Sequence, residues 1–484
     1  MNRIPQLILM FLMLSGGATI GISQDTAVAD AVEQGTVETA SEATLEQMQA
    51  SIDAAALAGH NAWMLTCCAL VLFMTAPGLA LFYGGLVRRK NVLSVMMQCI
   101  FLMGLMTVIW GLYGYSLAFG GTPDDNYLSH LIGNGEFLMM DNVSRTWDES
   151  AGAPFTPMEG VIPRLTHMLF QGMFFIITPA LICGAFAERM KFSAMVVYSV
   201  LWGTLIYCPL AHWVWDGGIL AFNGDQAIFG GALDFAGGTV VHISSGISAL
   251  VAAIMIGPRM GFGKLPLPPH NLTFTAVGSA MLWFGWFGFN AGSELASDEL
   301  TSSAFAVTHF SAAAGAVAWA ACEWLLRGKP TVLGASSGAV AGLVCITPAA
   351  GFVNPMPALI MGAIAGVACY WSCAKLKHIF KYDDALDAFG VHGVGGTVGA
   401  VLTGLFATRA CWDIGEGAKL GLFEGGNILA GQIAAVVVTY VYAGIGSIVL
   451  LLLIKMTIGL RVEANDEEQG LDISLHGEEA YVLN

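Results

Sequence analysis

Long apolar stretches separated by short polar loops form the main pattern of the chain from residue 61 onward. A helix needs about 20 apolar residues to cross the hydrocarbon core of a bilayer. Eleven stretches meet this requirement: residues 61–86, 92–119, 163–186, 192–215, 237–256, 271–292, 304–326, 332–350, 357–373, 391–407 and 428–454. Their apolar positions are continuous rather than alternating, which excludes a transmembrane β-barrel. The pattern predicts an all-α polytopic membrane protein with eleven transmembrane helices.

The composition agrees with this class and excludes others. The 484 residues are 56% hydrophobic and 11% charged, whereas soluble domains are about a quarter charged. The net charge of −16 excludes a nucleic-acid binder built on basic charge, and the apolar content excludes a disordered chain. The ten cysteines lie mostly in apolar stretches without a Cys-x-x-Cys pair, so neither a disulfide framework nor a thiolate metal site is expected.

The first 29 residues have the features of a secretory signal peptide. Arg3 precedes an apolar stretch over residues 7–22, and Ala27-Val28-Ala29 offers a small-residue cleavage site. Residues 30–60 are polar and would then form an exported N-terminal segment. The alternative is an uncleaved first helix.

The basic residues predict the orientation. Fourteen of the nineteen Lys and Arg residues would lie inside if the mature N-terminus is outside, among them Arg88, Arg189, Arg259 and Lys377. Four would lie outside: Arg145, Arg164, Arg409 and Lys419. Because cytoplasmic loops are enriched in Lys and Arg, this split predicts a multi-pass protein of the plasma (inner) membrane, in contact with its lipid. The tail, residues 457–484, would be cytoplasmic.

Two segments of the chain are similar to each other. Asp234 precedes His242 in the fifth stretch and Asp387 precedes His392 in the tenth, and both stretches contain Gly-Gly-Thr-Val. Stretches one to five and six to ten would form two five-helix halves. Because each half has an odd number of helices, the halves would run in opposite directions, as in transporters with substrate sites near the midplane.

His242 and His392 are the strongest candidates for pore chemistry. Ionisable groups within membrane spans mark functional sites, although a single buried histidine is more often structural. At about 1.5 Å per residue, about 10 Å of a core about 30 Å thick would separate the two, a gap that two imidazole side chains could close. A neutral imidazole offers one donor and one acceptor. No third ligand is apparent, so a metal site is not expected.

Aromatic residues form a second candidate site. Phe170 and Phe174 share one helix face, Trp215 ends the fourth stretch, and Phe289 and Ser293 end the sixth. Aromatic faces with a hydroxyl group suit a small cation such as ammonium, and an interfacial aromatic belt is the alternative. For Asp234, capping of the following helix is favoured over cation concentration or proton relay.

These residues lie in strings that resemble the ammonium transporter (Amt/Mep/Rh) family, specifically its bacterial Amt branch. The strings are residues 80–92 (ALFYGGLVRRKNV), 185–189 (AFAER), 234–242 (DFAGGTVVH), 285–293 (GWFGFNAGS), 333–335 (LGA) and 389–393 (FGVHG). The similarity covers about residues 61–481. Three residues depart from the family pattern: Trp213 and Asp216, which flank Trp215, and Glu294, which follows Ser293.

The resemblance implies a homotrimer in which each subunit has a central pore between its two inverted halves. It places ammonium binding at Trp215, Phe174 and Ser293, with Phe170 at the vestibule. It also implies a gate of Phe174 and Phe289 and a pore with His242, His392 and an essential Asp234. Residues 61–456 would form the transporter domain. The tail, which contains residues 459–462, 470–472 and 476–481, resembles tails that dock trimeric nitrogen-regulatory P-II proteins.

The predicted function is ammonium transport. Ammonium would lose water to the aromatic cage and deprotonate, and ammonia would cross the apolar pore between the histidines. Methylammonium is a further expected substrate, and no cofactor is expected. The resemblance leaves open whether the proton crosses separately. Two alternatives remain: an ammonium sensor that signals through its tail with little flux, and an integral-membrane enzyme, which is weaker because no catalytic set of residues is visible.

Overall fold

The structure is a computed structural model that describes residues 37–121 and 127–481. The predicted signal peptide and the start of the predicted exported segment lie outside the described residues. The chain divides into two units, residues 1–56 and 57–484. The described part of the first unit is helical and belongs to α1 (Val37–Phe73), which continues into the second unit. The second unit holds the loops and the tail.

Eleven helices of the described residues are long and apolar enough to cross a membrane, which confirms the predicted number. Span one consists of α1, η1 (Met74–Leu79) and α2 (Ala80–Leu86), and span two of η2 (Arg89–Asn91), α3 (Val92–Ile109), η3 (Trp110–Gly114) and α4 (Tyr115–Phe119). Span three is α5 (Arg164–Phe186). Span four consists of α6 (Phe192–Trp202), η6 (Gly203–Tyr207) and α7 (Cys208–Trp215). Span five consists of η8 (Gly238–Ile243) and α8 (Ser244–Ile256), and span six of α9 (Leu272–Ala291) and η9 (Gly292–Glu294). Span seven is α10 (Glu299–Arg327). Span eight consists of α11 (Val332–Ile346) and η10 (Thr347–Ala349). Span nine consists of α12 (Pro355–Trp371), η11 (Ser372–Leu376) and α13 (Lys377–Phe380). Span ten consists of η12 (Phe389–Gly393) and α14 (Val394–Phe406), and span eleven is α15 (Leu429–Thr457).

The predicted span boundaries hold to within a few residues in most cases. Span seven begins at Glu299, five residues before the predicted start, because Asp298 caps it in a reciprocal capping box with Thr301. Span nine continues past residue 373 to Phe380 through the π-helical turn η11. Asn271 and Thr331 cap α9 and α11 through their side-chain oxygens.

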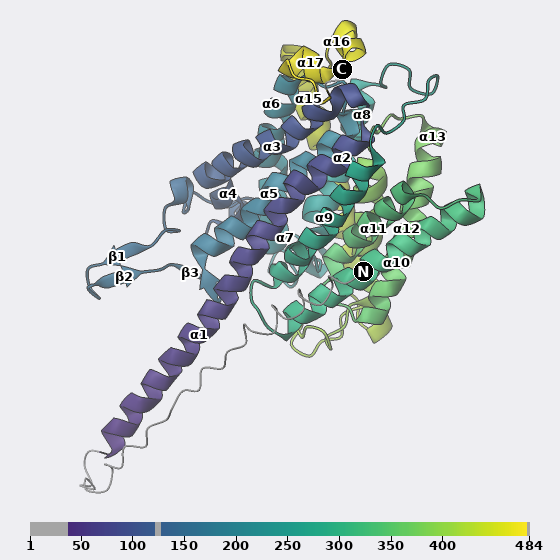
Figure 1. The fold of residues 1–484 in the computed structure, drawn as a ribbon. Helices are drawn as coiled ribbons and strands as arrows, with labels where there is room; N and C mark the ends of the chain where they lie inside the picture. Colours follow the sequence, from purple (N-terminus) through teal and green to yellow (C-terminus); the bar gives the residue numbers. More distant parts are fainter. Residues whose placement is uncertain (1–36, 122–126, 482–484) are drawn as a thin grey trace, which may run out of the picture. The chain divides into compact units, whose positions relative to one another are not determined.

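The long loop between spans two and three contains short strands that the apolar pattern does not predict. β1 (Thr146–Asp148) pairs antiparallel with β2 (Ala153–Phe155), and β3 (Met158–Glu159) pairs with β4 (Ile162–Pro163). The other end of the span bundle holds the tail helices α16 (Ala464–Gln469) and α17 (Leu471–His476), shown in yellow in Figure 1. α17 packs against η2 and α3.

Spans five and ten cross where two glycines meet. A Cβ atom on Gly246 of α8 would overlap the backbone of Gly393, the last residue of η12. Glycine at both positions therefore allows the two backbones to approach closely. Span three lies beside them, and 89% of its most apolar window is buried. This crossing brings together the segments that carry His242 and His392.

The two similar segments have equivalent structures, but the equivalent acid differs from the predicted one. η8 and η12 are π-helical turns that carry His242 and His392. Asp234 caps η8, whereas Asp384, not Asp387, caps η12 by accepting from the amides of residues 388 and 389 at 3.1 and 2.8 Å. Asp387 has a left-handed φ of 59° and lies 2.6 Å from Lys377 Nζ. In both segments the capping acid precedes the histidine by eight residues. The comparison of the two segments within the sequence matched Asp387 to Asp234 and missed this equal spacing.

Candidate functional site

Phe174 lies at the centre of the aromatic cluster that the sequence predicts. Its ring centroid lies 5.1 Å from that of Phe170 and 5.9 Å from that of Trp215, and both pairs meet edge to face. Phe174, Trp215 and Ser293 line one cavity of about 470 Å³, here called the outer cavity. Phe170 is fully buried beside Phe174 and is not among the residues that line it. The chain thus presents two aromatic faces and one hydroxyl group to the same space.

The rings of Phe174 and Phe289 separate the outer cavity from the interior of the second unit. Their centroids lie 4.2 Å apart and their planes are inclined by 36°. Phe174 lines the outer cavity, whereas Phe289 lines a small apolar cavity of about 10 Å³ that also touches His242 and His392. Ser293 donates to the carbonyl of Phe289 at 2.8 Å, which ties the hydroxyl group to the helix carrying the ring. The two rings therefore form an apolar barrier below the outer cavity.

His242 and His392 are in direct contact. Their Nδ1 atoms lie 3.2 Å apart and their rings are stacked at 24°, although 150 residues separate them in the sequence. Trp286 and Phe289 stack on His242 at centroid distances of 5.4 and 6.0 Å. His242 Nε2 is buried and has no hydrogen-bond partner among the described residues. The two imidazole side chains thus close the gap that helix geometry alone leaves between them.

The Nδ1–Nδ1 hydrogen bond constrains the protonation of the two rings. One Nδ1 must carry the hydrogen and the other must accept it, so two neutral rings have opposite tautomers. One Nε2 is then an acceptor and the other a donor. The pair consequently offers a hydrogen-bond acceptor at one end and a donor at the other.

A third cavity lies on the far side of the histidines. It has a volume of about 270 Å³ and is lined by His392 together with Phe82, Lys377 and Asp387, among others. We call it the inner cavity, for the side that is predicted to be cytoplasmic. Because His392 lines both this cavity and the small apolar one, the histidine pair lies between the inner cavity and the Phe174–Phe289 barrier.

The sequence model of the Ammonium Transporter Family matches residues 62–481. This chain belongs to that family. It is 46% identical to an ammonium transporter of Bacillus subtilis, over 87% of this chain and 98% of the relative. It is also 46% identical to an ammonium transporter of Aquifex aeolicus, over 88% and 94% of the two chains.

Solved structures with the same fold include the following two. The crystal structure of Saccharomyces cerevisiae Mep2 has a TM-score of 0.74 and 33% identity, and the match covers 84% of this chain and 88% of Mep2. A structure titled "Sensor Amt Protein" has a TM-score of 0.75 and 26% identity, with 87% and 99% coverage. The chain is therefore a multi-pass membrane protein, and relatives that share most of its length are named as transporters.

Asp234 accepts several hydrogen bonds from nearby residues. Its carboxylate accepts from the amides of Gly237, Gly238 and Thr239 at 2.9, 2.5 and 2.8 Å, and from the Thr239 hydroxyl group. Its carbonyl oxygen accepts from Trp215 Nε1 at 2.9 Å. Asp234 thus fixes both the start of the histidine-bearing span five and the ring of Trp215.

The acidic departures from the family pattern, Asp216 and Glu294, differ in their position, and Trp213 does not line the outer cavity. Asp216 lines the outer cavity, and its Oδ2 lies 3.0 Å from His212 Nδ1. Burial raises the pKa of Asp216, and the hydrogen bond and charge of His212 partly oppose that rise. Glu294 is not among the residues that line the outer cavity. Asp216 is therefore the departure that lies beside the candidate binding site.

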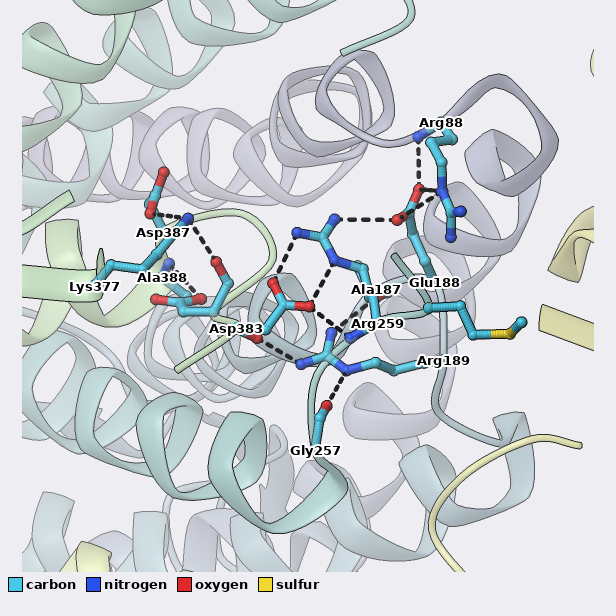
Figure 2. A network of polar contacts seen from close by, with 12 residues as sticks. Arg88, Ala187, Glu188, Arg189, Gly257, Arg259, Lys377, Asp383, Asp387 and Ala388 are labelled. Carbon is cyan, nitrogen blue, oxygen red and sulfur yellow. Dashed lines mark hydrogen bonds and ion pairs between the residues drawn. The ribbon is translucent and has the colours of Figure 1, made fainter. Parts of the chain in front are cut away.

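A buried ion-pair network at the inner end of the spans was missed by the sequence reasoning. Glu188 accepts from Arg88 Nε at 3.1 Å and from Arg259 Nη1 at 3.0 Å. Arg259 also holds Asp383 through two guanidinium nitrogens, at 2.9 and 2.8 Å. Arg189 donates to the carbonyls of Asp383 and Gly257 at 2.5 and 2.8 Å. Figure 2 shows these side chains converging from four separate segments.

The charges of this network keep its acids ionised. Burial alone would raise the pKa of Glu188, but the charges of Arg259 and Arg88 outweigh burial and lower it. Burial likewise opposes ionisation of Asp383, and the hydrogen bonds and charge of Arg259 lower its pKa. In the sequence, the acids and arginines of the network stand in loops next to span ends. A count of basic residues alone does not show which acid pairs with which arginine.

The tail docks on the loops of this network. Asn91 donates to Glu188 at 3.0 Å and accepts from the Leu471 amide at 2.8 Å. Asp472 accepts from the Ser94 amide at 2.7 Å, and Glu467 accepts from the Met260 amide at 2.7 Å. The segments predicted to be inside therefore share one end of the bundle with the tail. Among the described residues, no group of three or more His, Cys, Asp or Glu side chains could hold a metal ion.

Proposed function

We propose that this protein transports ammonium by binding NH4+ in the outer cavity and conducting NH3 between the outer and inner cavities. The observation that carries the proposal is the order in which cavities and side chains adjoin one another. The outer cavity, the stacked Phe174 and Phe289, the His242–His392 pair and the inner cavity follow one another. Membership of the ammonium transporter family supports the choice of substrate.

Binding in the outer cavity offsets part of the cost of removing water from the cation. The faces of Trp215 and Phe174 attract a cation, and such contacts contribute about 2 kcal/mol or more in desolvated sites. Ser293 adds a hydroxyl oxygen that can accept from ammonium, since its hydrogen is directed to the Phe289 carbonyl. Potassium is similar in size to ammonium, so this site alone discriminates poorly between the two.

Selectivity arises at the barrier below. An ion without partners is costly in an apolar environment, and the Phe174–Phe289 stack and the small cavity beneath it are apolar. Ammonium can lose a proton, whereas potassium has no neutral form. Ammonia is both donor and acceptor, which matches the donor and the acceptor that the histidine pair offers.

The histidine pair could also carry the proton separately. If His242 Nε2 takes a proton from ammonium, its Nδ1 hydrogen can pass to His392 Nδ1, and His392 Nε2 then releases its hydrogen to the inner cavity. This transfer leaves both rings neutral with exchanged tautomers. One such transfer moves one net charge to the inner side, and a further transfer requires each ring to exchange its hydrogen between its own two nitrogens without passing it back to the outer side.

Replacement of His242 by leucine tests this role. In proteoliposomes, we expect His242→Leu to lose ammonium-driven current, because leucine has neither donor nor acceptor, while size exclusion still shows the assembled protein. His309→Leu is the matched control, since His309 is exposed on α10 away from the pore. Wild-type ammonium current and unchanged potassium exclusion in His242→Leu would contradict the proposal.

A second candidate function is an ammonium sensor that signals through its tail with little flux. Likeness to the structure titled "Sensor Amt Protein" favours it, as do the contacts between the tail and the inner loops. Ammonium uptake by purified protein decides between the two, because a sensor would show binding without comparable flux.

The assembly and location follow from the family resemblance and the charge pattern. We propose a homotrimer with one pore in each subunit, in the inner membrane, with the mature N-terminus outside. The tail would be cytoplasmic and would dock a P-II regulatory protein. Chemical cross-linking in native membranes tests the trimer, which would appear as a limiting species of three subunits.

A further inference from the structure

A groove opens at the inner end of spans five and nine, outside the pore. It has a volume of about 580 Å³, and its lining includes Leu250, Ile254, Gly257, Phe380, Lys381 and Asp383. Its walls are thus mainly aliphatic and aromatic side chains from α8 and from the segment η11–α13. We call it the inner groove.

The position of the inner groove decides what kind of molecule can cover it. Ile254 is 60% exposed and lies two residues before the end of span five, and Phe380 is 69% exposed and ends span nine. Because both residues lie at or near span ends, we expect their side chains at the level where the spans leave the membrane. Large apolar side chains at this depth face acyl chains rather than water.

The charge at the rim selects among lipids. Lys381 lines the groove and is exposed, and no ion pair or hydrogen bond to its ammonium group occurs among the described residues. Asp383, which also lines the groove, is neutralised by Arg259. The Gly257 carbonyl already accepts from Arg189, as Figure 2 shows. The polar edge of the groove therefore presents one unpaired positive charge.

We infer that the inner groove binds an anionic phospholipid of the leaflet on the tail side. An acyl chain would lie between Leu250, Ile254 and Phe380, and the phosphate would contact Lys381. A free phosphate ion would leave the apolar walls uncovered. A polypeptide would bring backbone groups for which these walls offer few partners. The Lys381 charge complements an anionic headgroup better than a zwitterionic one.

Native mass spectrometry of the full-length protein tests the headgroup contact. Delipidated protein would be titrated with phosphatidylglycerol and, separately, with phosphatidylcholine. We expect Lys381→Gln to weaken phosphatidylglycerol binding about fivefold, the effect of one basic residue near an anionic lipid, and to leave phosphatidylcholine binding unchanged. Lys375→Gln is the matched control, since Lys375 is exposed on η11 but does not line the groove. Equal losses in both variants would overturn the assignment.

A second variant tests the apolar walls. Ile254→Trp places an indole in the groove at an exposed position, so the fold should tolerate it, and we expect loss of the bound phosphatidylglycerol. Ile364→Trp, at an exposed position of α12 outside the groove, is the control and should retain it. Retained lipid in Ile254→Trp would refute the inference. A change of oligomeric state in Ile254→Trp alone would also refute it, because the groove would then be a subunit interface.

Discussion

Asp234 illustrates at the residue scale how a single side chain can hold two parts of a site. Its carboxylate accepts from three successive backbone amides at the start of span five, and its carbonyl orients Trp215. The donors occupy both carboxylate oxygens. This arrangement favours the capping role, which the sequence reasoning preferred, over a free carboxylate that would attract cations.

Replacing Asp234 should therefore act first on stability. We expect Asp234→Ala to lower the free energy of unfolding by about 1–3 kcal/mol, because buried amides lose their acceptor, as measured by thermal unfolding in detergent. Asp234→Asn keeps one acceptor oxygen and should lose less. If Asp234→Asn unfolds like the wild type but has lost ammonium current, a direct role in conduction would replace the capping role.

At the scale of elements, the ion-pair network joins the loops after spans one, three, five and nine. Arg259 makes contacts with both Glu188 and Asp383, so removal of one partner leaves buried charge unpaired. Asp383 is followed by Asp384, which caps the histidine-bearing η12. The network thus lies one residue before the acid that caps span ten.

The network predicts a pH dependence of stability. Glu188 and Asp383 have lowered pKa values in the folded protein, so their stabilisation is present above the unfolded pKa values, near 4. It is lost as the pH falls through the lower folded values. We expect thermal unfolding to shift to lower temperature on acidification below about pH 4.

Asp383→Asn isolates this effect. The variant should be about 3–5 kcal/mol less stable at neutral pH, because Arg259 loses a buried partner, and its stability should fall less steeply in acid. Glu159→Gln serves as the control, because Glu159 pairs with Arg164 at an exposed position. A wild-type acid profile in Asp383→Asn would show that other groups determine the pH dependence.

At the scale of the whole molecule, the hydrogen bonds that join Leu471, Asp472 and Glu467 of the tail to the span ends lie at one end of the bundle. The loops at that end carry Arg88, Arg189 and Arg259, which the charge pattern predicts to be inside. The structure supports one common side for these segments, and the positive-inside rule predicts which side it is.

Labelling with a membrane-impermeant amine reagent tests the orientation. Lys264 and Lys375 are exposed at the tail end, and Lys419 is exposed in the loop between spans ten and eleven. In intact cells we expect modification of Lys419 alone, and of all three after permeabilisation, as read by peptide mass spectrometry. Modification of Lys264 or Lys375 in intact cells would reverse the predicted topology.

Deletion of residues 461–484 tests the regulatory role of the tail. The eleven spans should still insert, because the deleted segment lies after α15. We expect the truncated protein to lose most of its binding to a P-II protein in a pull-down from the purified components. The full-length protein with Glu463→Gln, an exposed tail position outside the three strings that resemble P-II-docking tails, is the control. Unchanged capture by the truncated protein would move the docking site to the loops.

The sequence by itself determined the class, the family and most of the candidate residues. Span length and apolar continuity are local properties, so eleven spans could be counted before any packing was known. The strings around Phe174, Trp215, His242, Phe289 and His392 were long enough to identify the family. Their side-chain types already restricted the chemistry to cation binding and neutral hydrogen bonding.

Only the tertiary structure decided which of these side chains meet. The contact between His242 and His392 depends on the close crossing of two helices at Gly246 and Gly393, which no local pattern specifies. The capping role of Asp384 depended on the backbone geometry at Asp387, which turns that side chain toward Lys377. The ion-pair network and the inner groove combine segments far apart in the sequence, because packing energy, unlike helix propensity, is a property of the assembled spans.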